Sequence, residues 1–522
     1  MNFPTFLSEL RFKRIPRRPP ISEGTANRQE DNQMSIRTNM SINRSPKFSF
    51  LSEDQLEEMF HGVLKVLNDT GADVHHEEAR EVFKKHGCKI DGKRVRIPPH
   101  LVRQALQSLP LMTTIFDWEG NEKIYIEKNR SYFGPGPTLL YYRDPETLER
   151  RKCLRKDATT TAKVCDALPN IGFVEGLVTI SDVSRGTDDV IEFADMIQNT
   201  TTPIMAWSYQ RGGARDIHRI GCIMAGGEEA FRNKPNYILY SEPISPLVSD
   251  FHAIDKVMYC AEHGIPQDYS PCAIGGATAP GSHAGQIIMA MSESLVGIIL
   301  AQLINPGTCV ILGGVQSILD MSRAIYSYGA PELNVLSGGL TELAKFLGLP
   351  MFGTAGCTDT KEMEIQSGIE AALQIHTSML TGANFVHDCG YTESGKTGDI
   401  FQTVMDDEII GMARVMEQGI EVSDETLGLE PIHNVGASGH FLYEDHTMKW
   451  FRKHWRPTLM DRNNYEEWVR NGSETMKERI IKKTRDILEN YEGPSARVPA
   501  DVKKDIEKVV KEAEERVERE GL

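Results

Sequence analysis

The spacing of apolar residues changes twice along the chain. Between residues 51 and 110, apolar side chains recur three and four positions apart in SEDQLEEMFHGVLKVLNDTG, EEAREVFKKHGC and PPHLVRQALQSLP. That period predicts amphipathic helices, and the Ser-x-x-Gln pattern that opens the first segment is typical of a helix N-cap. We therefore expect a helical N-terminal section over residues 45–111.

From about residue 112, short apolar runs of β type alternate with longer helical stretches. The candidate strands are TTIFDW (113–118), GFVEGLVTI (172–180), TPIMAWSY (202–209), NYILYSE (236–242), QDYSPCAI (267–274), GTCVILGG (307–314), LPMFGTA (349–355) and ANFVHDCG (383–390). Alternation of this kind predicts an α/β fold with a parallel sheet. Eight such units favour a (β/α)8 TIM barrel over residues 112–444. A doubly wound open sheet is the alternative, but it needs fewer units and no GxGxxG follows the first strand.

The two ends of the chain differ from this central region. Residues 445–522 return to long, charge-rich helical segments with opposite charges four positions apart, so we expect a helical C-terminal section. The start of the chain is basic and proline-rich in RFKRIPRRPP and polar in TANRQEDNQ. This composition cannot build an apolar core, and it predicts a disordered arm over residues 1–44.

Composition and charge narrow the class of protein. The 522 residues are 40 % hydrophobic and 25 % charged, and the net charge is −16, which disfavours nucleic acid or an anionic membrane surface as the main partner. No apolar run reaches the roughly 18–20 residues that span a bilayer. The nine cysteines form no CxxC pair, so we expect neither a disulfide framework nor a structural zinc site. These features predict a cytoplasmic enzyme.

In a barrel of this type, the active site lies at the carboxyl ends of the strands. The polar residues directly after the apolar runs are therefore candidates: Trp207, Tyr240, Glu242, Gly356, Cys357, Asp359, Lys361, His387, Tyr391 and Glu393. The set combines aromatic rings with carboxylates and contains few cations. Ring faces and carboxylates attract a quaternary or tertiary ammonium group, by up to about 2 kcal/mol for the cation–π part.

Other interpretations of the same residues remain open. His387 could be a hydrogen-bonded structural residue, Cys357 a small buried residue, and Trp207 part of the core. Asp359 could cap the helix that follows it. Cys357, His387 and Cys389 could also converge on zinc, although no local pair has familiar ligand spacing. We predict no metal site.

Several long motifs are more specific evidence of relationship than composition or residue type. In chain order they are GCKIDGKRVRIPPHLVRQAL, FGPG, KPNYILYSEPISPL, GTAGCTDTKEMEIQSG, GANFVHDCGYTESG and GIEVSDETLGLEPIHNVG. With these motifs the chain resembles the trimethylamine methyltransferase family over roughly residues 45–515. The resemblance implies a (β/α)8 barrel, often oligomeric, that moves a methyl group from an amine to a cobalt corrinoid on a partner protein.

The resemblance also points to a branch of that family. In the trimethylamine enzymes pyrrolysine precedes a Ser-Asp-x-Lys motif, whereas Cys357 precedes Thr358-Asp359-Thr360-Lys361 here. The chain therefore looks like the pyrrolysine-free branch, which demethylates quaternary amines such as glycine betaine. A quaternary ammonium leaves as a neutral amine, so attack on its methyl group needs no general acid, only a held cation and an aligned bond.

Together these considerations give one set of expectations. We expect a quaternary-amine:corrinoid methyltransferase without a tightly bound cofactor, working with a corrinoid protein and forming a homo-oligomer. We predict His387, Asp359 and Glu242 as catalytic residues. The predicted substrate contacts are Glu393, Tyr391, Trp207, Tyr240, Gly356, Cys357 and Lys361. A tertiary-amine methyltransferase of the trimethylamine type and a non-catalytic binder of quaternary amines are the alternatives.

Overall fold

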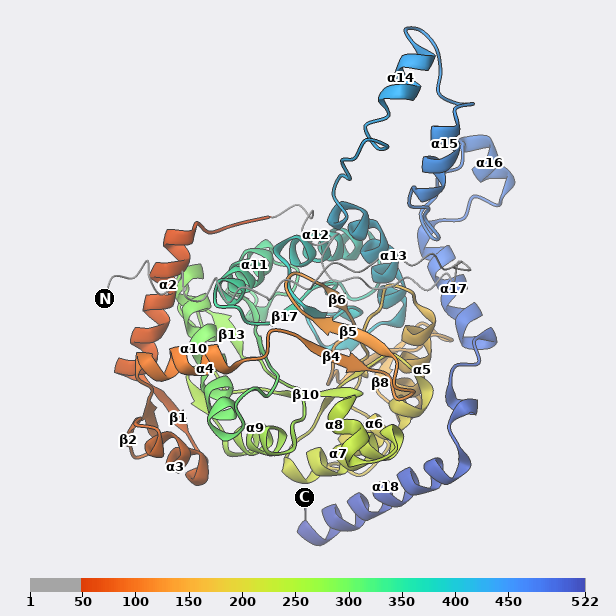
Figure 1. The fold of residues 1–522 in the computed structure, drawn as a ribbon. Helices are drawn as coiled ribbons and strands as arrows, with labels where there is room; N and C mark the ends of the chain where they lie inside the picture. The colour runs from red at the N-terminus through yellow and green to blue at the C-terminus, as the bar shows by residue number, and fades with distance from the viewer. Residues whose placement is uncertain (1–47, 522) are drawn as a thin grey trace, which may run out of the picture. The chain divides into compact units, whose positions relative to one another are not determined.

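The computed structural model describes residues 48–521. The arm expected over residues 1–44 lies outside the described residues. Figure 1 shows a group of parallel strands surrounded by helices, with further helices contributed by both ends of the described chain.

The largest sheet of the described part has seven strands, all parallel, in the order β6-β18-β17-β14-β12-β10-β9. Their bounds are Tyr132–Phe133 (β6), Ile204–Trp207 (β9), Tyr237–Ser241 (β10), Gln267–Tyr269 (β12), Val310–Gly313 (β14), Met351–Thr354 (β17) and Phe385–His387 (β18). Six of these strands fall within runs that the apolar pattern predicted. The prediction of an α/β fold with a parallel sheet is therefore confirmed.

The two edges of this sheet are both linked to the predicted run at 172–180. An isolated parallel bridge joins Phe133 of β6 to Ile171, and another joins Val174 to Ile204 of β9. The Val174 amide donates to Pro203 O at 2.9 Å, and the Gly172 amide donates to Phe133 O at 2.7 Å. A sheet whose two edges reach the same short segment is strongly curled.

The first predicted strand has a different role from the one expected. TTIFDW does form β4 (Thr113–Phe116), but β4 pairs antiparallel with β5 (Glu122–Ile126) in a separate hairpin. The edge position in the parallel sheet belongs instead to β6, which ends at Phe133, the first residue of the FGPG motif. The hairpin packs its own isoleucines against the sheet, because Ile115, Ile124 and Ile126 share one apolar cluster with residues of the parallel strands. Figure 1 shows β4 and β5 in front of the strands.

Side chains alternate along each parallel strand, and this alternation sets up the site. Phe173, Met205, Ile238, Ile311, Phe352 and Phe385 form the apolar cluster together with the hairpin. Because strand periodicity is two, the next residue on the same face of each strand lies two positions later, toward its carboxyl end. The hairpin therefore covers an apolar layer, and the following layer is free to be polar.

Helices cover the outer face of the sheet (Figure 1). Their bounds are Arg155–Ala167 (α5), Asp188–Asn199 (α6), Arg211–Ala225 (α7), Glu228–Asn233 (α8), Phe251–His263 (α9), His283–Ile304 (α10), Pro331–Phe346 (α11), Ile365–Thr381 (α12) and Ile400–Glu417 (α13). Among the described helices, α10 alone is long and apolar enough to cross a membrane, and 83 % of its most apolar window is buried, as expected of a core helix.

The N-terminal section contains the predicted helices and also strands that the apolar pattern did not predict. The helices are Glu53–Lys65 (α2), with the π-helical turn Val66–Thr70 (η2), Glu77–Lys85 (α3) and Pro99–Ser108 (α4). The Ser52 hydroxyl accepts from the Gln55 amide, so the predicted cap is present. Between the helices lie Ala72–Val74 (β1), Lys89–Asp91 (β2) and Arg94–Arg96 (β3), which form a small sheet with Val248–Ser249 (β11).

Short strands in the connections after the parallel strands form two further sheets. One contains Cys272–Gly275 (β13), Val315–Asp320 (β15) and Ile325–Tyr326 (β16). The other contains Tyr141–Arg143 (β7), Arg150–Lys152 (β8), Tyr391–Thr392 (β19) and Thr397–Gly398 (β20). The run QDYSPCAI therefore splits between β12 and β13, each in a different sheet.

The C-terminal section is helical, as the charge-rich pattern predicted. Residues 445–522 contain Asp445–Trp450 (α15) with Phe451–Lys453 (η3), Tyr465–Arg470 (α16), Met476–Asn490 (α17), Ser495–Arg497 (η4) and Ala500–Glu520 (α18). Leu429–Val435 (α14) precedes this section, within the range 112–444 that was expected to belong to the barrel. The chain returns to α13 at Thr458, where the amides of Thr458 and Leu459 donate to the Glu408 carboxylate at 2.8 and 2.9 Å.

Candidate functional site

A polar layer follows the apolar layer of the curled sheet. Counting two residues on from Phe173, Ile238, Phe352 and Phe385 gives Glu175, Tyr240, Thr354 and His387, at the carboxyl ends of their segments. Asp268 of β12 is in register with Tyr240 of β10. Because these strands are parallel, their ends meet at one edge of the sheet, and so the polar side chains gather there.

His387 lies between two acids. Its Nδ1 is 3.0 Å from Asp388 Oδ1 and 3.7 Å from Glu175 Oε2. Its Nε2 is 3.1 Å from the Thr354 hydroxyl, and its ring lies 4.2 Å from that of Phe352. Burial lowers the pKa of His387 to about 3, so the imidazole is neutral near pH 7.

Glu175, like Asp268 and Asp388, is a buried acid whose carboxylate has no hydrogen-bond partner among the described residues. It is 1 % exposed. Burial raises the pKa of Glu175 well above its usual value, and the neighbouring acids Asp388 and Asp268 raise it further. A buried carboxyl group without partners is costly, and such groups concentrate at functional sites.

The other two acids are also buried. Burial raises the pKa of Asp388 well above its usual value, and neither of its carboxylate oxygens has a hydrogen-bond partner within residues 48–521. Burial likewise raises the pKa of Asp268, and Ser270 partly offsets it. Burial and mutual repulsion disfavour the ionised forms of these three neighbouring acids. A cation placed among them would favour ionisation.

Aromatic rings surround this group of acids. Tyr391 lies 5.9 Å from Tyr328, which lies 5.2 Å from Tyr326. On the other side Tyr240 lies 5.9 Å from Phe352. The half-buried Tyr240, Tyr326 and Tyr328 keep part of their surface accessible to water. Rings and carboxylates in this arrangement match the chemistry of an ammonium ligand.

Glu242 lies at the accessible side of the group. It follows β10, it is exposed, and its Oε2 accepts a hydrogen bond of 3.4 Å from the Tyr240 hydroxyl. Burial in the surrounding protein still raises its pKa to about 7, and Lys256 lowers it only partly. A carboxylate that water reaches but that protein largely surrounds indicates where a ligand enters. We refer to Glu175, Asp268, His387 and Asp388, with Glu242 at the entrance, as the acidic site.

Gly356 and Cys357 begin the loop after β17. Gly356 has φ +80°, and a Cβ there would lie 2.8 Å from Cys389 Sγ, so only glycine fits. Cys357 is fully buried; its amide and thiol donate to Gln374 Oε1 at 3.0 and 3.2 Å. Burial raises the pKa of the Cys357 thiol well above its usual value, which makes it a poor nucleophile.

The Asp359 carboxylate links the loop after β17 to two other loops by hydrogen bonds. Its carboxylate accepts from the Tyr328 amide and the Ser394 hydroxyl, both at 2.8 Å, and from the Ser327 hydroxyl. These bonds hold the segment that carries Tyr328, so Asp359 positions a wall of the acidic site. Lys361 is exposed, and its ammonium donates to the Asp359 carbonyl at 2.8 Å.

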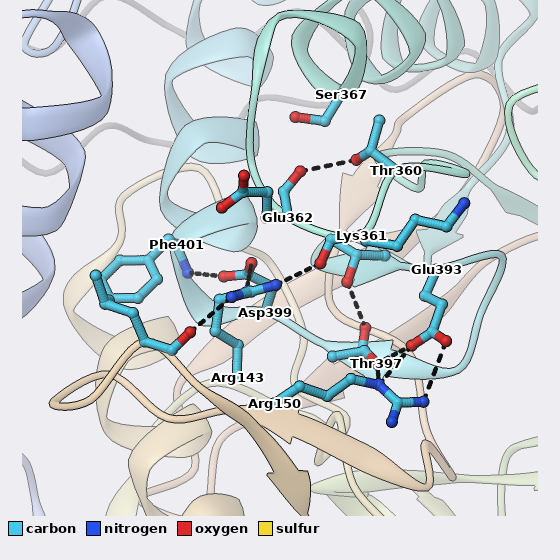
Figure 2. Close-up of polar contacts among 12 residues, drawn as sticks. Arg143, Arg150, Thr360, Lys361, Glu362, Ser367, Glu393, Thr397, Asp399 and Phe401 are labelled. Atoms are coloured by element: carbon cyan, nitrogen blue, oxygen red, sulfur yellow. Dashed lines mark hydrogen bonds and ion pairs between the residues drawn. The ribbon is translucent and has the colours of Figure 1, made fainter.

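Two other predicted contacts already have partners. Glu393 forms a two-pronged ion pair with Arg150, at 2.6 and 3.1 Å, and accepts from Thr397 at 2.7 Å. Figure 2 shows this pairing, beside Lys361 and the loop that carries it. Trp207 is 8 % exposed and donates to Glu192 Oε1 at 3.3 Å.

The structure thus brings together His387, Tyr391, Tyr240 and Glu242. Asp359, Gly356 and Cys357 shape the adjoining loop, whereas Glu393, Lys361 and Trp207 are held by other partners. Sequence reasoning missed Glu175, although a glutamate inside the apolar run GFVEGLV was a signal. It also missed Asp268 and the tyrosines of the 326–328 segment. No group of three or more His, Cys, Asp or Glu side chains in residues 48–521 is arranged to hold a metal ion.

Comparison with known proteins identifies the family. The sequence matches the family model described as trimethylamine methyltransferase (MTTB) over residues 21–517. The chain belongs to the trimethylamine methyltransferase family. Its relatives in that family are named methyltransferases, and this chain is a methyltransferase.

The family relatives cover nearly the whole chain. A glycine betaine methyltransferase of Desulfitobacterium hafniense is 31 % identical over 463 residues, 88 % of this chain and 96 % of that protein. A trimethylamine methyltransferase, MttB2 of Methanosarcina mazei, is 32 % identical over 484 residues, 90 % of this chain and 96 % of that protein.

A solved structure resembles this methyltransferase in fold. The Methanosarcina barkeri monomethylamine methyltransferase aligns with a TM-score of 0.50 and 12 % identity, over 87 % of this chain and 90 % of that chain. The likeness supports the α/β architecture with its curled parallel sheet.

Proposed function

We propose that this methyltransferase removes a methyl group from a quaternary amine of the glycine betaine type and passes it to a cobalt corrinoid on a partner protein. The observation that carries the proposal is the Glu175 carboxylate, buried without a hydrogen-bond partner 3.7 Å from His387 and beside two further acids. The relatives named for glycine betaine and trimethylamine point to the same class of substrate.

The acidic site would bind the cationic end of the substrate. A quaternary ammonium cannot donate a hydrogen bond, so carboxylate charge and ring faces are the interactions open to it. Glu175, Asp268 and Asp388 supply the charge, and Tyr240, Tyr326, Tyr328 and Tyr391 supply the rings. The bound cation would favour the ionised carboxylates, so binding would be coupled to release of protons.

The reaction requires little acid–base catalysis by the protein. A quaternary ammonium departs as a neutral amine, so no residue has to protonate the leaving group. His387, neutral and held by Thr354 Oγ1, would fix the Asp388 carboxylate against the cation and thereby orient one N–CH3 bond. Orientation of this kind is worth several powers of ten in rate.

The residues at the entrance fit a corrinoid supplied by a partner. The acidic site opens at the carboxyl ends of the strands, where Glu242 is exposed, so a group on another protein can approach it. When docked, the corrinoid supplies the nucleophilic cobalt that accepts the methyl group. Residues of this chain would exclude water and align the substrate.

We also propose that the curled sheet is a closed (β/α)8 barrel. The support is the pair of bridges at Ile171 and Val174, which puts the 171–174 segment where an eighth strand would stand. The hairpin β4–β5 would close the amino-terminal end of that barrel with its isoleucines. A cytoplasmic setting fits the nine cysteines, none of which forms a disulfide within the described residues.

The test monitors methyl transfer by absorbance spectroscopy. The purified protein is mixed with a reduced corrinoid, free and protein-bound, and with a panel of betaines and methylamines; formation of the methylated cobalt species changes the visible spectrum. The proposal expects one or more quaternary amines to react. Reaction with trimethylamine alone would favour the tertiary-amine alternative. Binding of quaternary amines without any methyl transfer, even with the corrinoid protein present, would favour the binding protein.

A further inference from the structure

We propose that Glu242 makes this methyltransferase prefer quaternary amines with a net positive charge, such as choline or tetramethylammonium, over zwitterionic betaines. The inference rests on the proposed function, because it assumes that the acidic site binds the methylated ammonium group. It concerns the other end of the substrate, which we call the tail. A tail that carries a hydroxyl group, or no polar group at all, is accepted, whereas a tail that carries a carboxylate is repelled.

Glu242 lies one layer beyond the residues that would hold the ammonium group. Ile238, Tyr240 and Glu242 occupy alternate positions along β10 and the residue that follows it, so their side chains share one face of the strand. Two residues of a strand advance the chain by about 6–7 Å. The tail oxygens of choline and of glycine betaine lie two or three bonds from the nitrogen, about 3–4 Å away. A tail that points out of the acidic site therefore approaches the Glu242 carboxylate.

Protein surrounds this entrance closely, although water reaches it. Tyr240, Cys272, Tyr326 and Tyr328 are half-buried, and Glu242 is exposed. Burial nevertheless raises the pKa of Glu242 to about 7 and the pKa of Cys272 to about 12. A charged tail is therefore partly desolvated at the entrance, and its interaction with the Glu242 carboxylate is stronger than it would be in bulk water.

The charged groups that act on Glu242 are mostly acids. Asp250, the N-cap of α9, raises its pKa, and Lys256 of the same helix lowers it. Glu242 in turn raises the pKa of Asp268 and of Asp388. The other titratable groups whose pKa it raises, on β10, β12, β13 and β19, are Tyr240, Tyr269, Cys272 and Tyr391. A carboxylate tail would therefore enter a region of negative potential.

Lys256 is poorly placed to offset these acids. It is 7 % exposed, and its ammonium group donates to the Ser208 carbonyl at 2.5 Å, directly after β9. Burial lowers the pKa of Lys256 from its usual value. A buried ammonium that already bonds a backbone carbonyl is not available to pair with a substrate carboxylate.

The proposal predicts a ratio of affinities that depends on pH. At pH 8 Glu242 is mostly ionised, and choline should bind at least ~30-fold more tightly than glycine betaine. Both ligands share the methylated ammonium group, so titration of the buried acids changes both affinities in the same direction, and the ratio reports the tail. At pH 6 Glu242 is mostly protonated and can donate to a tail carboxylate, so the ratio should fall by at least ~10-fold.

Titration calorimetry of the full-length protein measures these affinities without a corrinoid. The ligands are choline, tetramethylammonium and glycine betaine, at pH 6 and pH 8. Glu242→Gln should reduce the ratio at pH 8 to about threefold or less and remove its dependence on pH, with a thermal midpoint that shows the variant to be folded. Glu229→Gln is the matched control, because Glu229 is exposed on α8, outside the entrance, and should keep the wild-type ratio.

The outcomes separate this inference from the proposed function. Wild-type protein that binds glycine betaine as tightly as choline at pH 8 would overturn the role of Glu242, and so would a ratio that does not change with pH or survives Glu242→Gln. Demethylation of glycine betaine in preference to choline, with the corrinoid protein present, would also overturn it but would support the proposed function. Tight binding of choline without demethylation of any quaternary amine would support the role of Glu242 and overturn the proposed function.

Discussion

The Glu175→Gln substitution separates the stability of the free enzyme from its function. Glutamine keeps the shape of the side chain and removes its ability to ionise. Because burial raises the pKa of Glu175, the folded protein holds a proton that the unfolded chain, with a pKa of 4.5, releases as the pH rises. The wild-type protein therefore loses stability between pH 4.5 and 7, by at most about 3 kcal/mol at 1.36 kcal/mol per pH unit.

The substitution should remove that loss. Unfolding entropy of about 2 cal/mol/K per residue over 522 residues is about 1 kcal/mol/K, so the thermal midpoint at pH 7 should rise by up to roughly 3 °C. The difference should vanish near pH 4, where both forms of the protein are protonated. Scanning fluorimetry of both proteins across this pH range is the assay.

The same substitution should damage function. Removing one member of a buried charge pair costs about 2–5 kcal/mol, so binding of the reactive amine should weaken by at least ~30-fold. Glu293→Gln is the contrast: burial raises the pKa of Glu293 as well, but the hydrogen bonds from the Leu247 amide at 2.6 Å and the Ser245 hydroxyl at 2.8 Å partly offset that shift, so Glu293→Gln should stabilise the protein less than Glu175→Gln. The reasoning fails if Glu175→Gln keeps both the wild-type affinity and the wild-type pH profile of stability.

Three further predictions follow from other residues. Because the pKa of Glu242 is about 7, the affinity for a permanently charged amine should rise by up to ~5-fold between pH 6 and 7. Glu242→Gln should flatten that profile in titration calorimetry, and a steep profile in the variant would contradict the assignment. Gly356→Ala should lower the thermal midpoint by about 2 °C or more. Gly226 also has a positive φ but has open space around it, so Gly226→Ala should lower the thermal midpoint less; equal decreases would refute the steric argument. Cys357→Ala should keep the rate of methyl transfer, measured by the cobalt spectrum, within about twofold of the wild-type rate, because the buried neutral thiol is a poor nucleophile. Loss of methyl transfer in a folded variant would contradict this interpretation of Cys357.

The apolar pattern was sufficient for the parallel strands and most helices. Runs such as NYILYSE and LPMFGTA are short, apolar and rich in β-branched or aromatic residues, so local preference and burial agree. It was not sufficient for the pairing of TTIFDW. A short apolar strand fits a parallel sheet or a hairpin equally well, and the choice depends on partners distant in the sequence. The short strands β1 to β3 were missed for the same reason.

The sequence by itself determined the family, the alternating architecture and the strand ends at which the chemistry would lie. His387, Tyr240, Tyr391 and Glu242 were recognisable there because each directly follows or ends an apolar run. Only the tertiary structure decided that Glu393 is held by Arg150, that Asp359 ties loops together and that Glu175 stands uncompensated beside His387. The physical reason is that a carboxylate's role depends on which charge or donor faces it across the fold, and residue type does not encode that partner.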